Sequence, residues 1–327
     1  MSNEQNKSCC PGGFKTMCGG QALIEGIMMR GPKKQAAVVR RPDGELEIRE
    51  EELKFIKDRY PILGWPLIRG VATFLDSMVN GVKTLMWSAE FFPEEEDAAP
   101  EEPSKMELWL ERKLGSEKMS SLVVTLAVVM GIGLSIVLFF LLPTLLGGVV
   151  SLVTKSMLAR NLAESLLKIV IFMAYLALCS RMKDIRRVFQ YHGAEHKTIF
   201  CYEAGLPLTV ENVRLQSRHH PRCGTSFLFV VIIVSILVST VVFSIWPVYN
   251  ALLRFLAHLV MLPLIVGVSY EFNRWCGRND NALTRVLTAP GLWMQNFTTF
   301  EPDDSMIEVG IKALELVLPE EKGSDTW

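Results

Sequence analysis

The chain has 327 residues, half of them hydrophobic, and its formal net charge of −1 gives no reason to expect nucleic acid as a partner. Its charges are concentrated in residues 1–118, 181–222 and 271–327, which is typical of a polytopic membrane protein rather than a soluble one. Most of the seven cysteines fall on segments that we assign to the cytosol, so no disulfide framework is expected.

Residues 1–58 are predicted to form a cytosolic tail and a small β unit. The N-terminal residues lack the apolar core of a secretory signal, so the N-terminus is expected to start in the cytosol. Residues 20–31 and 34–41 are strand-like, and Pro42–Glu45 is a predicted turn before an alternating segment.

Residues 59–118 are predicted to hold amphipathic helices and an acidic linker. Pro66 is suited to the first position of a helix, and apolar residues follow it at spacings of three and four. This helix either packs on the small sheet or lies on the membrane surface. After the acidic linker, Ser104 and Glu107 form a capping box for a short helix before the membrane. The apolar stripe of the first helix comprises Leu67, Val71, Phe74, Met78, Val82 and Leu85.

Residues 119–270 are predicted to be a membrane domain of four spans. The stretches between Lys118 and Lys155 and between Arg222 and Arg254 carry no charge, and each exceeds the roughly 20 residues that a spanning helix needs. Pro143 is expected to break the first of these helices. Two weaker spans carry polar residues, which must lie at an end or face other helices. These residues are Glu164 and Lys168 in one span, and Arg254 and His258 in the other.

Lysine and arginine indicate the orientation of these spans. Residues 105–118, 181–222 and 271–285 carry four, eight and three of them, whereas the two opposite loops carry three in all. Because positive charge favours the cytosolic side, both termini are expected in the cytosol. The chain is therefore placed in a bacterial-type cytoplasmic membrane, in contact with the lipid bilayer.

Two cytosolic helices are expected after the second span and at the end of the chain. The second spanning helix is predicted to continue into the cytosolic loop 181–224, as far as Gly205. Within residues 271–327, Asp304 and Ser305 are expected to cap a second amphipathic helix, and Glu308 completes a capping box. The fold class is thus mainly α, a four-helix transmembrane bundle with a small β unit and cytosolic amphipathic helices.

Residues 192–196 form a His-x-x-Glu-His motif. On a helix, His192 and His196 lie on one face within reach of a single cation, and Glu195 lies beside that face. Glu195 is therefore a candidate catalytic base, able to accept a proton from a water that the metal holds. The arrangement matches that of the inverzincins.

A second cluster, residues 219–223, supplies the remaining predicted ligands, His220 and then Cys223. Three protein ligands with water would indicate a catalytic divalent metal, zinc by preference, whereas four including Cys223 would indicate a structural one. The alternative is that the two motif histidines only hydrogen-bond to carbonyls or carboxylates. Glu271 matches the inverzincin ligand spacing, which we attribute to coincidence, and His258 is expected to satisfy a neighbouring helix.

Four blocks carry a resemblance to the YqhQ-like family of bacterial membrane proteins, over nearly the whole chain. They are GGQALIEGIMMRGP, YHGAEHKTIFCYEAGLPLTVENV, HPRCGTSF and QNFTTFEPDDSMIEV. The family is a domain of unknown function labelled a predicted metal-dependent enzyme. The resemblance implies one functional surface that includes Gly20, Gln21, Glu25, Arg30, His192, Glu195, His196, His220, Cys223, Thr299 and Glu301.

Two hypotheses of different classes follow. The first is a metal-dependent hydrolase at the cytosolic membrane face, with Glu195 as general base. The second is a non-catalytic scaffold or assembly factor for other membrane proteins, such as the protein-insertion machinery. They are separated by whether Glu195 faces an open metal position.

Overall fold

A computed structural model describes residues 14–53, 60–92, 116–153, 156–279, 281–319 and 323–326. The chain divides into two compact units. Unit 1 comprises residues 1–92, 175–235 and 262–327, and unit 2 comprises residues 93–174 and 236–261. The predicted acidic linker and the helix capped by Ser104 fall outside the described residues.

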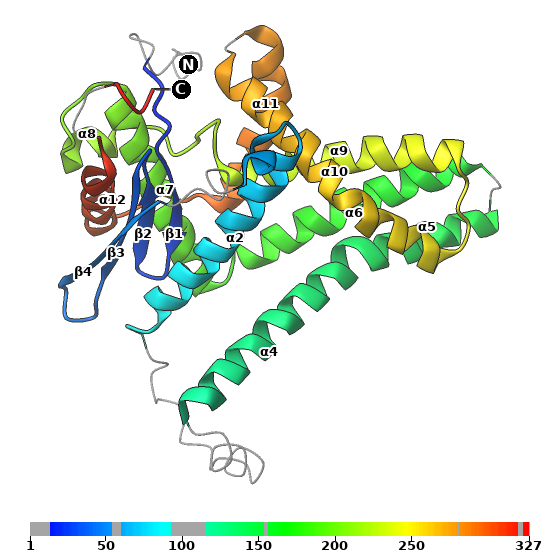
Figure 1. Cartoon of the computed structure of the whole chain (residues 1–327), viewed down its shortest axis with the longest axis horizontal. Coiled ribbons are helices and arrows are strands. Elements are labelled where there is room, and N and C mark those ends of the chain that lie inside the picture. The colour runs from blue at the N-terminus through cyan, green and yellow to red at the C-terminus, as the bar shows by residue number, and fades with distance from the viewer. Residues whose placement is uncertain are drawn as a thin grey trace. The chain divides into compact units, whose positions relative to one another are not determined.

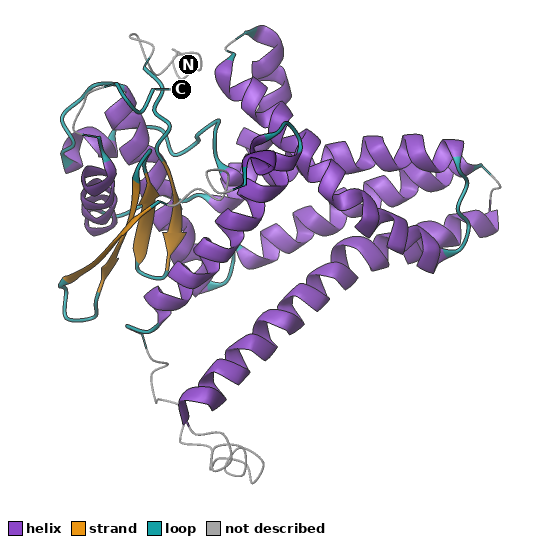
Figure 2. Ribbon diagram, viewed as in Figure 1, coloured by secondary structure: helices purple, strands orange, loops and turns teal. Residues whose placement is uncertain are grey.

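Unit 1 is built on an antiparallel four-stranded meander in the order β1-β2-β3-β4 (Figures 1 and 2). The strands are β1 (Gly19–Leu23), β2 (Gly26–Arg30), β3 (Lys34–Arg40) and β4 (Leu46–Glu52). The predicted small β unit is therefore confirmed. Its first strand-like segment contains two strands joined at Glu25, which has a φ of 49°.

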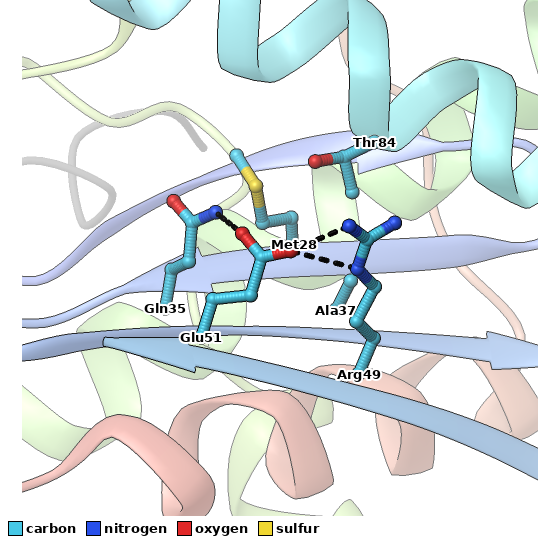
Figure 3. Close-up of a pocket in the computed structure, with 6 residues that line it drawn as sticks. All are labelled: Met28, Gln35, Ala37, Arg49, Glu51 and Thr84. Carbon is cyan, nitrogen blue, oxygen red and sulfur yellow. Dashed lines mark hydrogen bonds and ion pairs between the residues drawn. The ribbon is translucent and has the colours of Figure 1, made fainter. Parts of the chain in front are cut away.

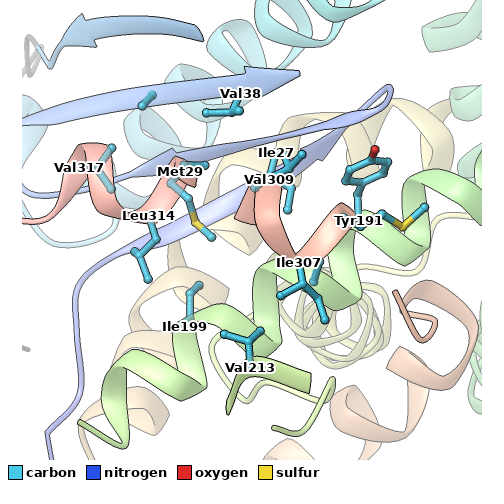
Figure 4. Close-up of a cluster of buried hydrophobic side chains, with 14 of the residues drawn as sticks. Ile27, Met29, Val38, Tyr191, Ile199, Val213, Ile307, Val309, Leu314 and Val317 are labelled. Atoms are coloured by element: carbon cyan, nitrogen blue, oxygen red, sulfur yellow. The ribbon is translucent and has the colours of Figure 1, made fainter. Parts of the chain in front are cut away.

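One face of this sheet forms the main core of unit 1. The helices α7 (Lys183–Glu203), α8 (Val210–Arg214) and α12 (Asp304–Val317) pack there. Successive strand residues point to opposite faces, so alternate positions of β2 and β3 enter this core. It contains Ile27, Met29, Val38, Tyr191, Ile199, Val213, Ile307, Val309, Leu314 and Val317 (Figure 4).

The opposite face of the sheet is covered by the C-terminal part of α2 (Ile68–Ala89). Leu85 and Trp87 pack against Leu23, Met28 and Val39. The predicted packing of this helix on the sheet is confirmed for that part. A pocket on the same face is lined by Met28, Gln35, Ala37, Arg49, Glu51 and Thr84 (Figure 3).

The start of α2 differs from the prediction. A 3-10 turn, η1 (Pro61–Gly64), precedes it, and the helix begins at Ile68 rather than at Pro66. Leu67 has a φ of 68°, outside the helical region, and its amide donates to Oε1 of Glu271 at 3.4 Å. Leu67, which the sequence pattern places inside the helix, is therefore non-helical and is hydrogen-bonded to Glu271 instead.

Four helices of the described residues are long and apolar enough to cross a membrane: Thr125–Val150, Met157–Cys179, Gly224–Ile245 and Ala251–Arg278. The first lies within a continuous run of α4 (Ser116–Ile136), the π-helical turn η2 (Val137–Leu141) and α5 (Leu142–Val153). The others are α6 (Met157–Cys179), α9 (Gly224–Ile245) and α10 (Ala251–Arg278). The chain is mainly helical with four candidate spans, as predicted.

Pro143 does not break the first span. It lacks the N–H that would bond to the carbonyl of Phe139, and the π-helical turn just before it accommodates the loss. The second span does not continue into the next helix either. α6 ends at Cys179 and α7 begins at Lys183, because Met182 adopts an extended backbone with ψ of 131°.

The C-terminal part of the chain differs from the prediction in its helix caps and in an additional helix. The N-cap of α12 is Asp303, whose side chain accepts from the amide of Met306 at 3.0 Å, rather than Asp304 or Ser305. Glu308 pairs with Arg40 at 2.7 Å, which places its carboxylate on the sheet. A further helix, α11 (Ala282–Thr298), was not predicted; a capping box of Asn281 and Thr284 starts it.

Candidate metal centre

Helix α7 carries the His-x-x-Glu-His motif, and its four-residue spacing puts both histidines on one face. The two imidazole rings lie 4.4 Å apart between centroids. A glycine between them permits close approach of the chain that follows α11. A Cβ at Gly193 would lie 2.0 Å from the carbonyl oxygen of Phe300.

Both histidines are oriented by backbone carbonyls. Nδ1 of His192 lies 2.8 Å from the carbonyl oxygen of Thr298, and Nδ1 of His196 lies 2.6 Å from that of Arg218. A proton on Nδ1 satisfies these carbonyls, so Nε2 is the ring atom that would bind a metal, which would displace any proton there. Outer hydrogen bonds of this kind are the usual support of metal-binding histidines.

Cys223 completes a group of three candidate ligands. Its Sγ lies 3.1 Å from Nε2 of His192, and the ligand atoms of His192, His196 and Cys223 all lie within 4.8 Å of one another. Nε2 of His196 is buried and has no hydrogen-bond partner among the described residues. Thiolate and imidazole together are the ligands that zinc commonly takes in proteins.

Glu195 lies next to this group and is almost completely buried. One carboxylate oxygen accepts from the amide of Gly20 in β1 at 3.0 Å, whereas Oε2 has no partner within the described structure. The close approach depends on Gly20, because a Cβ there would lie 3.0 Å from Cδ of Glu195. One carboxylate oxygen is thus held while the other remains available.

His220 takes a different position from the one predicted. Its ring lies 5.5 Å from that of His196 between centroids, but its Nε2 faces Oε2 of Glu203 at 3.8 Å and Nη2 of Arg222 at 3.4 Å. The group of three contains Cys223 and not His220. His220 is therefore a neighbour of the cluster whose ring nitrogen is directed toward an ion pair.

The charges of the group depend on one another. Burial disfavours ionisation of Cys223, but His192 and His196 outweigh it and hold the pKa of the thiol well below its usual range. Burial likewise disfavours the imidazolium of His192, yet the Cys223 thiolate raises its pKa to about 9. Burial raises the pKa of Glu195, and it lowers that of His220 to about 4.

The other family positions are distributed around α7 and the sheet. Thr299 accepts through its carbonyl from Arg218, and Glu301 pairs with Lys197 of α7 at 2.7 Å. Glu25 pairs with Arg187 and accepts from the hydroxyl of Tyr191 at 3.1 Å. Two further family positions contact α2 instead: Gln21 donates to the carbonyl of Gly81 at 3.4 Å, and Arg30 pairs with Asp76 at 2.9 Å.

Three residues that were not among the named candidates support the centre. The backbone carbonyls of Thr298 and Arg218 orient the histidines, and the side-chain amide of Gln295 holds the backbone of His220 through bonds of 2.8 and 2.7 Å. Gln295 and Thr298 lie in the block QNFTTFEPDDSMIEV, which could have indicated them, whereas the backbone carbonyl of Arg218 leaves no signal in residue type.

Glu271 and His258 lie elsewhere. Glu271 pairs with Arg69 of α2 at 2.5 Å and belongs to no candidate metal group. His258 contacts a neighbouring helix, as expected: its Nε2 lies 3.0 Å from Nζ of Lys168 on α6.

Comparison with known proteins identifies relatives whose function is not described. Residues 65–320 match the family model described as "Protein of unknown function (DUF1385)". The chain is 34% identical over 306 residues to "Uncharacterized protein YqhQ" of Bacillus subtilis (strain 168), covering 92% of each chain. No solved structure matches. On both grounds, the chain belongs to this YqhQ-like family.

Proposed function

We propose that this membrane protein binds one zinc ion through His192, His196 and Cys223 and acts as a metal-dependent hydrolase. The convergence of these three ligand atoms within 4.8 Å carries the proposal. Three protein ligands leave a fourth position, which is the arrangement of catalytic rather than structural zinc. Bound zinc would supply Lewis acidity and lower the pKa of a water in that position.

Glu195 is the proposed general base. Its Oε1 is fixed by the amide of Gly20, so the carboxylate is positioned while Oε2 is left to accept a proton. The two histidine Nδ1 atoms are engaged with carbonyls and take no part in proton transfer. Hydrolysis is the reaction that a metal-bound water and an adjacent base would serve, on a substrate such as a peptide or a lipid headgroup.

A scaffold held together by a structural metal is the second candidate, and burial favours it. Only 1% of His196, 5% of Glu195 and 7% of Cys223 is exposed, whereas a catalytic centre must admit a substrate. The group also connects α7, the loop before α9 and the end of α11 through ligands and supporting carbonyls. A metal there would hold the cytosolic elements in place for other membrane proteins.

Metal analysis of the purified full-length protein tests the centre itself. We expect about one zinc per chain in the wild type and its loss in His196→Ala and in Cys223→Ser. His258→Ala is the matched control, since it removes a buried histidine away from the group and should leave the zinc content unchanged. Wild-type protein folded in zinc-replete medium but free of metal would remove the basis of the hydrolase.

Glu195→Gln separates the two candidates. Glutamine keeps the size of the side chain and an oxygen acceptor for Gly20 but cannot act as a base. A hydrolase should keep its zinc and lose about 100-fold or more of its activity, measured as complementation of a deletion strain. Full complementation at normal protein abundance would support the scaffold instead.

A further inference from the structure

Unit 2 holds a buried cluster of charged side chains in the N-terminal half of α6 and the first turn of α10. Arg160, Glu164, Lys168 and Arg254 are each less than 10% exposed. Three of these side chains are cations and one is an anion, so the cluster carries an excess of positive charge. Charged groups within spanning helices are costly and are normally paired or functional.

Glu164 is the only carboxylate that these cations contact among the described residues. Oε2 accepts from Nε of Arg254 at 2.7 Å. Oε1 accepts from the hydroxyl of Thr144 at 3.0 Å and lies 3.3 Å from Nζ of Lys168. Within the described structure Glu164 pairs with Lys168 and Arg254 and not with Arg160.

Several buried donors in the cluster have no hydrogen-bond partner in the described structure, although the guanidinium of Arg254 lies 3.9 Å from the ring centroid of Phe243. They are Nε and Nη2 of Arg160, Nη1 of Arg254 and Nδ2 of Asn161. The three side chains are at most 2% exposed, so bulk solvent does not reach them. Buried N–H groups almost always find an acceptor, and four orphaned donors on neighbouring side chains indicate that an acceptor belongs there.

The two helices bring these donors together. Arg254 donates through Nη2 to Oδ1 of Asn161 at 2.6 Å, and Arg160 donates through Nη1 to the carbonyl of Tyr249 at 3.2 Å. Arg160 and Arg254 are the fourth residues of α6 and α10, and Asn161 follows Arg160. Helix N-termini carry partial positive charge, which adds to that of the guanidinium groups.

We propose that Arg160, Asn161 and Arg254 form a binding site for the phosphate group of an anionic lipid. Phosphate offers several acceptor oxygens to converging guanidinium donors and offsets the excess positive charge. The starts of two candidate spanning helices lie where lipid headgroups meet a membrane protein, and in the orientation expected from lysine and arginine they face the outer leaflet. The site is independent of the proposed metal centre.

Titration of the purified full-length protein in uncharged detergent tests the site. The probes are dioctanoyl-phosphatidylglycerol, dioctanoyl-phosphatidylcholine and inorganic phosphate, and the readout is the melting temperature. We expect saturable stabilisation by phosphatidylglycerol and little by phosphatidylcholine, whose headgroup carries a compensating cation. Equal stabilisation by inorganic phosphate would retain the anion site but overturn the lipid as its source.

Variants locate the effect. Arg160→Gln should weaken the apparent affinity for phosphatidylglycerol by about tenfold or more, since it removes charge-assisted donors. Arg181→Gln, which removes an exposed cation just after α6, should bind as the wild type does. Asn161→Asp keeps the oxygen that accepts from Arg254 and replaces the free donor by negative charge, so it should also lose binding. Unchanged affinity in either site variant, or no stabilisation of the wild type by any probe, would overturn the proposal.

Discussion

Gly193 lies where α7 passes closest to the chain that connects α11 to α12. The carbonyl oxygen of Phe300 would be 2.0 Å from a Cβ at this position, and Cδ of Pro302 would be 3.5 Å away. Alanine would gain about 1 kcal/mol in helix propensity, but the overlap with backbone cannot be relieved by a side-chain rotation. A glycine is thus required at position 193 because α7 packs there directly against the backbone of Phe300.

Gly193→Ala should therefore destabilise the protein, by about 1–3 kcal/mol as for other overpacked sites, and lower its zinc content. Thermal unfolding in detergent and metal analysis would measure the two effects. Gly131→Ala is the helical control, because nothing lies within 4 Å of its would-be Cβ. Equal melting temperatures for the two variants would show that α7 and Phe300 are not in close contact.

His220 and His196 give a second comparison at the level of single residues. Since Nε2 of His220 faces Glu203 and Arg222, His220→Ala should keep about one zinc per chain, whereas His196→Ala should lose it. Metal content measured on equal amounts of folded protein decides between the two arrangements. Loss of zinc from His220→Ala but not from Cys223→Ser would favour His192, His196 and His220 as the ligands, as expected from sequence.

The sequence predicted two members of the group because helical spacing alone aligns His192 with His196. It also predicted Cys223, from the short second cluster. It ranked His220 first because residue type does not reveal the direction of a side chain. That direction follows from Glu203, on the last turn of α7, which pairs with Arg222 and lies beside His220. A contact between distant residues of this kind has no local sequence signal.

At the scale of elements, α2 has three faces. Gly70, Gly81, Thr84 and Ser88 are buried, whereas Thr73 is exposed on the polar side. A third face is apolar and exposed, formed by Ile68, Leu75, Met78, Val79 and Val82. Close packing of Gly70 on Tyr270 fixes the start of α2 to α10, a candidate span. An exposed apolar stripe beginning at a spanning helix is suited to the membrane interface.

We therefore expect the exposed apolar face of α2 to contact lipid. A polarity-sensitive fluorophore on Val79→Cys should emit at shorter wavelength than free fluorophore in water when the protein is in lipid nanodiscs. Thr73→Cys, on the opposite exposed face, should keep an aqueous spectrum in the same nanodiscs. Identical spectra for the two positions in lipid would contradict an interfacial α2.

Elements with a strong hydrophobic pattern were predicted from the sequence. Elements whose residues depart from the usual helix preferences were not. The uncharged stretches identified two spans from composition alone, and the sheet was visible from its turn and alternation. α11 escaped prediction because Pro290 and Gly291 lie inside it, and both residues normally argue against helix. The break between α6 and α7 escaped because residues 180–182 contain no proline or glycine.

At the scale of the whole molecule, segments before, between and after the candidate spans share one core. Ile27 and Val38 of the sheet pack with Tyr191 and Ile199 of α7 and with Leu314 of α12. Arg40 of β3 also pairs with Glu308 of α12. These segments must lie on one side of a membrane, so an even number of crossings must separate each from the next. Four spans, two before α7 and two after it, satisfy this requirement.

Accessibility labelling tests this topology in intact cells, with the labelling of the parent chain subtracted. Cysteines replacing Asp43 in the β3–β4 turn, Asp184 in α7 and Glu315 in α12 are at exposed positions, so all three should react only after the cytosol is opened. Tyr249→Cys, in the connection between α9 and α10, should react from outside without permeabilisation, because its side chain is 65% exposed. We expect the shared core in the cytosol because residues 181–222 carry an excess of lysine and arginine. The reverse labelling pattern would invert the orientation and leave the even count intact, whereas a difference between Asp43 and Glu315 would contradict the shared core itself.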